Sequence, residues 1–163
     1  MYLKNQLYAI NLTDKYGGIM SKDKYAGIRL ENQLCFPLYV CSKEIVRRYK
    51  PYLDELNLTY TQYIAMMVLW EEREVTVTEL GKQLFLDSGT LTPLLKKLEQ
   101  KGFVTRKRME SDERNVCISI TDKGDRLKEE AVKIPEKMSC CISLNPEEVK
   151  TLYTILQKVL GNF

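Results

Sequence analysis

Residues 87–120 constrain the fold of this chain more strongly than any other stretch, because a helical pattern is followed directly by two strand patterns. After the turn "DSG" at 87–89, leucines recur at the spacing of one helical face: Leu91, Leu94, Leu95 and Leu98. Gly102 follows at the position where a helix commonly ends. The segments "FVTRKR" and "VCISI" then flank the polar turn "MESDERN", which is typical of a β-hairpin.

A second helix is predicted just before the first. "VTVTELGKQLFL" favours a strand of two or three residues and then a short helix, with Thr78 as N-cap and Leu80 and Leu84 on its inner face. Two helices joined by a short turn make a helix-turn-helix, and a hairpin directly after it is a wing.

Helical patterns also flank this central part. From Arg29 the apolar positions fall into two stripes about 100° apart on a helix: Leu34, Leu38, Cys41 and Ile45 on one, and Cys35, Tyr39, Ser42, Val46 and Tyr49 on the other. A helix that is apolar on two sides needs the chain's own core on one side and a partner chain on the other. Pro51 is expected to interrupt this helix, and Thr59 with Gln62 predicts a capping box that starts the next.

The C-terminal part is expected to be helical too. Thr121 is predicted to open a long amphipathic helix through about Met138. Asn145, with Pro146 and Glu148 after it, starts a last helix, whose apolar face holds Val149, Leu152, Tyr153, Leu156 and Leu160. Residues 1–28 show no stable period, so we expect a poorly ordered or loosely packed N-terminal extension before a domain at 29–163.

Composition narrows the function classes. The chain has five cysteines and no histidine, and it has neither an export signal nor an apolar run long enough to span a membrane. We therefore expect a cytoplasmic protein with reduced thiols. Without histidine, a CxxC pair or a nucleotide-phosphate loop, the sequence predicts no metal, no cofactor and no enzyme of a common class.

Charge is concentrated although the net charge is only +3. Between positions 96 and 114 the basic residues are Lys96, Lys97, Lys101, Arg106, Lys107, Arg108 and Arg114, against the acidic residues Glu99, Glu110, Asp112 and Glu113. A local basic surface of this kind is suited to phosphate.

Two sets of motifs now point to a family. "SDERNVCISITDKG", with Asp112 and Arg114, resembles the wing signature of the MarR family of winged-helix regulators. "LENQLCFPLYVCSKEIVRRYKPYLDELNLTYTQY" and "LFLDSGTLTPLLKKLEQKGFVTRKR" resemble its OhrR-type, organic-hydroperoxide-sensing repressors. The resemblance covers about Leu30 to Pro135.

The resemblance implies a mainly α fold with a small β-wing. It would be a winged helix-turn-helix homodimer, paired through N- and C-terminal helices at about 29–57 and 122–163, around a DNA-binding lobe at about 59–121. The implied function is a repressor that leaves its double-stranded DNA operator when an organic hydroperoxide oxidises a cysteine.

The residues expected to bind DNA lie on the leucine-rich helix that follows "DSG" and on the wing. On the helix, small side chains can approach base edges or phosphates, and lysines can neutralise phosphate; these are Ser88, Thr90, Thr92, Pro93, Lys96 and Lys97. On the wing, Arg114 is expected in a minor groove with Asp112 orienting it, and Arg106 and Arg108 add positive charge. The alternative is a solvated hairpin whose surface ion pair contributes only about 0–1 kcal/mol.

The cysteines are expected to differ in role. Cys41 is predicted to be a small core residue. Cys35 lies near a helix start and shares its stripe with the hydroxyl groups of Tyr39, Ser42 and Tyr49, which favours a reactive thiolate. Pro37 either starts the regular helix near Phe36 or bends it.

The resemblance extends these roles. It places the peroxidatic cysteine at Cys35, with Tyr49 and Tyr60 hydrogen-bonded to it. Because 14 residues of straight helix span roughly 21 Å, Cys35 and Tyr49 of one chain could not touch, and the tyrosines would belong to the other subunit. Cys140, with Cys141 beside it, falls where some relatives carry a resolving thiol.

Two alternative functions remain open. One is a MarR-type repressor that is released by a small aromatic ligand and makes no use of Cys35. The other is a thiol peroxidase.

Overall fold

The computed structural model describes residues 25–109, 112–139 and 143–163; the side chains of residues 109 and 112–115 lie outside the described part. The chain divides into two compact units, Met1–Arg47 and Arg48–Phe163. Of the predicted extension, residues 1–24 lie outside the described part. No helix among the described residues is both long enough and apolar enough to cross a membrane.

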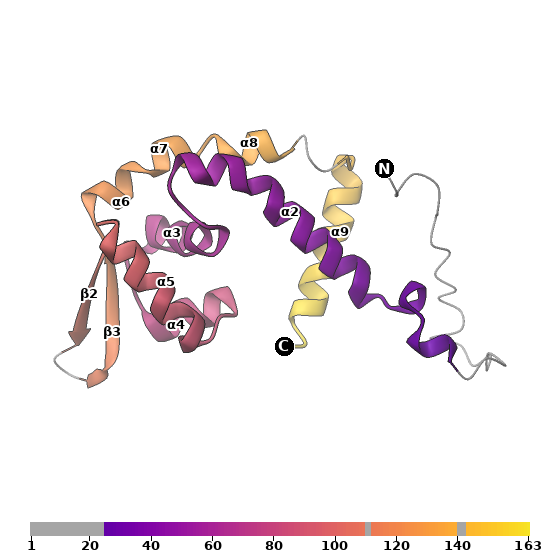
Figure 1. The fold of residues 1–163 in the computed structure, drawn as a ribbon, viewed down its shortest axis with the longest axis horizontal. Coiled ribbons are helices and arrows are strands. Elements are labelled where there is room, and N and C mark those ends of the chain that lie inside the picture. Colours follow the sequence, from indigo (N-terminus) through magenta and orange to yellow (C-terminus); the bar gives the residue numbers. More distant parts are fainter. Residues whose placement is uncertain (1–24, 110–111, 140–142) are drawn as a thin grey trace. The chain divides into compact units, whose positions relative to one another are not determined.

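The first unit contains two short 3-10 helices, η1 (Ala26–Ile28) and η2 (Leu30–Asn32), and the first part of α2 (Cys35–Glu55) (Figure 1). The regular helix therefore begins later than the expected start at Arg29. Pro37 is the third residue of α2, where a backbone N–H has no partner within the helix. Pro37 thus lies in the first turn of the helix, which decides between the two alternatives for this residue.

The interruption predicted at Pro51 is wrong. Helix α2 continues through Pro51 to Glu55. A proline inside a helix removes one hydrogen bond and crowds the carbonyl one turn earlier. Burial of Leu53, which is 1% exposed, and of Leu56 just after the helix offsets that loss.

Helix α3 (Tyr60–Glu72) starts with the predicted capping box. The Gln62 amide donates to the Thr59 hydroxyl at 3.3 Å, and the Thr59 amide donates to Gln62 Oε1 at 3.1 Å. Its buried apolar residues include Ala65, Met66 and Leu69. Cap and core face therefore agree on one helix in the centre of the second unit.

Helix α4 (Val77–Leu84) is capped by Thr76, not by Thr78 as predicted. Thr76 has extended backbone angles, and Glu79 stands three residues later, so the pair forms a capping box; Thr78 is already inside the helix. Leu80 is fully buried, while Leu84 is half-buried.

Helix α5 (Ser88–Gln100) starts at the N-cap Asp87. Its four inward leucines are all buried, as predicted. Gly102 follows with φ +73°, a backbone conformation that favours glycine and ends the helix as expected. The pair α4–α5 is therefore a helix-turn-helix.

The sheet has three antiparallel strands, β1 (Glu74–Thr76), β2 (Val104–Met109) and β3 (Asp112–Ile120), in the order β1-β3-β2. Val104 pairs with Ile120, and Val75 pairs with Ile118, which is fully buried. Strands β2 and β3 form the predicted wing after α5 (Figure 1).

The long helix predicted from Thr121 is three short ones: α6 (Asp122–Arg126), α7 (Lys128–Ala131) and α8 (Ile134–Ser139). Thr121 is the N-cap, as expected. Pro135 cannot donate to the carbonyl of Ala131, which accounts for the break between α7 and α8.

The last helix, α9 (Pro146–Leu160), has the predicted capping box of Asn145 and Glu148. Its apolar face is exposed in the described chain; Leu156, at 37%, is the least exposed of the five predicted face residues. The described residues of the single chain therefore do not bury this apolar face.

Candidate nucleic-acid interface and thiol site

The outward side of α5 carries the predicted DNA-binding residues. All six are exposed, because the leucines occupy the opposite side: Ser88, Thr90, Thr92, Pro93, Lys96 and Lys97. Pro93 is the sixth residue of α5, just beyond the first turn of the helix. The helix thus presents hydroxyl groups at its start and two lysines further along.

The first turn of α5 is already ordered by local hydrogen bonds. The Asp87 carboxylate accepts from the Thr90 amide at 2.9 Å and from the Thr90 hydroxyl at 3.0 Å. These two bonds hold the pKa of Asp87 below its usual value. The Thr92 hydroxyl donates to the Ser88 carbonyl at 2.7 Å. The hydroxyl groups of Thr90 and Thr92 are therefore held in place before any ligand binds.

The wing carries positive charge, and one of its arginines connects it to α5. Arg106 contacts Glu99 Oε2 through Nε and Nη2, each at 2.7 Å, so its guanidinium ties β2 to α5. Lys107 and Arg108 are exposed. Asp112 and Arg114 lie on β3, but their side chains are outside the described part.

The base of the wing is anchored by contacts that the sequence did not predict. The Thr121 hydroxyl donates to the Gly102 carbonyl at 2.7 Å. The Trp70 indole donates to the Gly124 carbonyl at 2.9 Å. A side chain at Gly124 would place its Cβ 2.1 Å from the Phe103 carbonyl oxygen, so only glycine fits there. The sequence signal for this close contact was a glycine, Gly124, in the first turn of a predicted helix.

The structure brings together the two tyrosines expected to act on the sensor thiol. The ring centroids of Tyr49, on α2, and Tyr60, on α3, are 5.1 Å apart. Tyr63 lies 6.0 Å from Tyr49, and Trp70 lies 6.0 Å from Tyr63. Burial, followed by the charges of Tyr49 and Tyr60, raises the pKa of Tyr63. Tyr63 and Trp70 were missed as site residues, although the spacing 60, 63 and 70 follows one helical face.

The thiols occupy different environments. Cys35 is the first residue of α2 and is exposed, and Tyr39, one turn later, is also exposed. Cys41 is exposed as well, so the chain's own described residues do not provide its predicted packing. Burial, followed by the nearby Glu74, raises the pKa of Cys117, which disfavours its thiolate. Cys140 and Cys141 lie outside the described residues.

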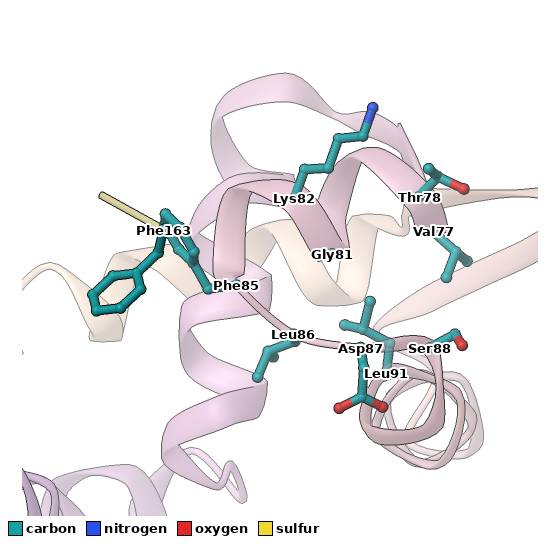
Figure 2. Close-up of a pocket in the computed structure, with 10 residues that line it drawn as sticks. All are labelled: Val77, Thr78, Gly81, Lys82, Phe85, Leu86, Asp87, Ser88, Leu91 and Phe163. Carbon is teal, nitrogen blue, oxygen red and sulfur yellow. The ribbon is translucent and has the colours of Figure 1, made fainter. Parts of the chain in front are cut away.

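Two hollows mark the second unit. One, of about 380 Å³, lies beside the tyrosine cluster; it is lined by Tyr63, Met67, Trp70, Lys128, Glu129, Ala131, Val132 and Pro135. The other, of about 540 Å³, adjoins the helix-turn-helix turn. Figure 2 shows Phe85 and Phe163 at one end of it and Asp87, Ser88 and Leu91 at the other. Within the described residues, no group of three His, Cys, Asp or Glu side chains could hold a metal.

A helix-turn-helix followed directly by a β-hairpin defines a winged-helix protein of the transcriptional-regulator class. The family model "Transcriptional regulator SarA/Rot" matches residues 47–131. The organic hydroperoxide resistance transcriptional regulator of Bacillus subtilis (strain 168) is 51% identical over 140 residues, covering 83% of this chain and 95% of that one. The HTH-type transcriptional regulator SarZ of Staphylococcus aureus (strain USA300) is 44% identical, covering 81% and 89%.

Solved structures of similar proteins lead to the same class. Reduced AbfR bound to DNA matches with a TM-score of 0.69 and 38% identity, covering 83% of this chain and 95% of that chain. The Staphylococcus aureus MepR–DNA complex, at 23% identity and a TM-score of 0.72, shares the fold. The chain belongs to the MarR family of winged-helix transcriptional regulators, in the group that includes the OhrR type. These relatives confirm the predicted family and fold class, and they make the chain a regulator rather than an enzyme.

Proposed function

We propose that this regulator represses transcription by binding an operator, senses organic hydroperoxides through oxidation of Cys35, and then releases the DNA. The paired rings of Tyr49 and Tyr60, 5.1 Å apart, carry this proposal. The pair brings together two side chains that each carry a hydroxyl group, and one thiolate can accept a hydrogen bond from both. The 51% identical relative is itself named for organic hydroperoxide resistance.

For DNA binding, we assign base and phosphate contacts to the exposed side of α5. Ser88, Thr90 and Thr92 are small enough for the helix start to approach base edges, while Lys96 and Lys97 neutralise phosphates. Pro93 offers an apolar surface to a thymine methyl group. The relative AbfR, in its reduced form, has been solved as a complex with DNA, which supports this assignment.

The wing adds contacts beside α5. We assign Arg108 to the phosphate backbone and Arg114 to a minor groove, with Asp112 orienting the Arg114 guanidinium. Arg106 supports this interface from below, because its ion pair with Glu99 holds the wing strand against α5. The basic side chains of the wing are thus held beside α5, so that wing and helix contact the DNA together.

We propose that the working form is a homodimer. The apolar face of α9 is exposed in the single chain. Leu34, just before α2, and Leu38, on α2, are exposed too. Apolar faces of this kind are suited to an isologous contact with a second copy. In such a dimer the sensor Cys35 of one subunit meets Tyr49 and Tyr60 of the other, and Tyr39 lies one helical turn from the thiol.

The redox step begins at the Cys35 thiolate. It attacks one oxygen of the hydroperoxide, the O–O bond breaks, and the organic part leaves as an alcohol after it takes up a proton. The sulfur is oxidised to a sulfenic acid. The thiolate of Cys140 in the other subunit then attacks that sulfur, the S–O bond breaks, a disulfide forms, and the hydroxide that leaves takes up a proton to become water. Oxidation removes the charged acceptor of the tyrosine hydroxyl groups, which repositions the DNA-binding lobes.

A DNA-release assay on the protein's own upstream region tests the proposal. The wild type is expected to leave the DNA after treatment with cumene hydroperoxide, and Cys35→Ser is expected to stay bound. Cys41→Ser is the matched control, because it removes an exposed thiol of the same helix and should release normally. Release of Cys35→Ser by the hydroperoxide would contradict the sensing role.

A second candidate, release by a small aromatic ligand, is favoured by one observation. The 380 Å³ hollow beside the tyrosine cluster is walled by Tyr63, Met67 and Trp70 and is large enough for a small ring compound. Trp70 is the only tryptophan of the chain, so its fluorescence reports binding there. Release of Cys35→Ser from DNA by an aromatic acid, with quenching of Trp70, would select this candidate.

A further inference from the structure

One lysine joins the end of α5 to the segment around Tyr60, the first residue of α3. Lys101 is the C-cap of α5, and its ammonium reaches out of the helix to two acceptors. Lys101 Nζ donates to the Asn57 carbonyl at 2.6 Å and to Gln62 Oε1 at 2.9 Å. These acceptors stand three residues before and two residues after Tyr60 in the chain.

The acceptor side of this contact is rigid. Gln62 is 1% exposed, and it is the one buried polar side chain among the residues that the structure describes. Its Oε1 also accepts the Thr59 amide of the α3 capping box, so it cannot turn away without breaking the helix start. Asn57 has φ +54°, and the neighbouring Leu58 is buried. The loop therefore moves with the first turn of α3.

The donor side is equally constrained. Lys101 is half-buried, and burial, followed by the charge of Lys97, lowers its pKa. Its own carbonyl accepts from Lys123 Nζ at 2.7 Å, which connects it to α6. Lys101 therefore connects the end of α5 with two other segments: its ammonium contacts residues 57–62, at the start of α3, and its carbonyl contacts α6.

From this geometry we infer that Lys101 is the positioning residue that couples the tyrosine pair to α5, the helix to which the DNA contacts are assigned. The inference rests on the proposed function, because the signal it passes on is oxidation at the tyrosine pair. Movement of Tyr60 with the start of α3 displaces both acceptors of Lys101, and the end of α5 follows. In the reduced state the same bonds hold α5 in the orientation that binds DNA.

Lys101→Met tests this coupling, since it keeps the length of the side chain and removes the donor. The readout is the ratio of the DNA Kd after and before oxidation by cumene hydroperoxide. Coupling between sites is typically about 5- to 150-fold, so we expect a wild-type ratio in that range and a ratio within about threefold of one for Lys101→Met. Gln62→Met, which removes an acceptor without changing charge, is expected to lower the ratio in the same direction.

Lys97→Met is the matched control, because it removes an equal charge from the same helix. It should weaken DNA binding in both states and leave the ratio unchanged. If Lys101→Met behaves like Lys97→Met, with a lower salt dependence and a wild-type ratio, Lys101 is a phosphate contact and the coupling role is overturned. An unchanged ratio with unchanged affinity overturns it too.

A reciprocal measurement separates this inference from the sensing proposal. Linkage requires that DNA binding also affect the loop. In the reduced protein, DNA is expected to slow amide exchange at residues 57–62 in the wild type but not in Lys101→Met. If the wild type does not respond to hydroperoxide, the sensing proposal fails while this result still decides the coupling. Equal protection in both proteins would rule the coupling out.

Discussion

The rings of Tyr49 and Tyr60 lie 5.1 Å apart with their planes at 61°, an edge-to-face pair that joins α2 to α3. Such pairs are favourable because the positive ring edge meets the negative ring face. Eleven sequence positions separate the two residues, yet packing places their hydroxyl-bearing side chains in one cluster.

Removing the tyrosine hydroxyl groups should slow sensing without loosening the cluster. In Tyr49→Phe and Tyr60→Phe the rings still pack, but the Cys35 thiolate loses a donor. A hydrogen bond to a charged group is worth about 1.5–3 kcal/mol, so we expect oxidation by cumene hydroperoxide to slow by about tenfold or more. Stopped-flow measurement checks the rate. Tyr153→Phe, on α9, is the control, and an unchanged rate in both cluster variants would remove the tyrosines from the sensing site.

The resolving role of Cys140 predicts a defined product. After cumene hydroperoxide, mass spectrometry should find a disulfide between Cys35 of one subunit and Cys140 of the other. This link should disappear in Cys140→Ser and persist in Cys141→Ser, which is its matched control. Finding only mixed disulfides with small thiols, and no link between chains, would mean that Cys140 does not resolve the sulfenic acid.

Gly124→Ala should destabilise the fold. The new Cβ would lie 2.1 Å from the Phe103 carbonyl oxygen, and the shift would also disturb the Trp70 hydrogen bond. We expect a loss of about 3 kcal/mol in the free energy of unfolding, at the upper end for overpacking. Urea denaturation at fixed protein concentration measures it. At Gly161 a Cβ makes only ordinary contacts, so Gly161→Ala should change stability by less than about 0.5 kcal/mol.

The cap of α4 distinguishes two threonines two residues apart. Thr76→Ala removes the side chain that accepts the Glu79 amide and should cost about 1 kcal/mol of stability. Thr78→Ala replaces an exposed residue inside the helix and should cost much less. Thermal unfolding of the two variants side by side would show the difference, and equal losses would disprove the assignment of Thr76 as the cap.

Asp125 should contribute to stability at neutral pH and lose that contribution in acid. Arg73, at 2.6 Å, and then Lys128, at 2.9 Å, hold the pKa of Asp125 below its usual value. A carboxyl whose pKa is lower in the folded state stabilises fully above its unfolded pKa of about 4. That stabilisation is lost as pH falls through the lower folded pKa. Asp125→Asn should therefore flatten the acid side of the stability curve, which denaturation between about pH 2 and 7 would reveal.

Several local elements could be predicted from the sequence alone. The Thr59–Gln62 and Asn145–Glu148 boxes start their helices as predicted, because both partners are three residues apart and form the cap within one turn. The leucine spacing in α5 and the hairpin pattern after it also predicted the observed elements, because helical and strand periods decide which side chains share a face. These elements, together with the wing motif, were sufficient to predict the family.

The contacts between distant residues depend on how the folded chain packs. Pro51 stays inside a helix because Leu53 beyond it is buried, and Arg106 pairs with Glu99 because β2 packs on α5. Lys101 and Asn57 are 44 positions apart in the sequence, and their hydrogen bond forms only when the chain folds. No local pattern encodes such contacts, since their free energy comes from burial and charge pairing between segments that approach only in the packed core.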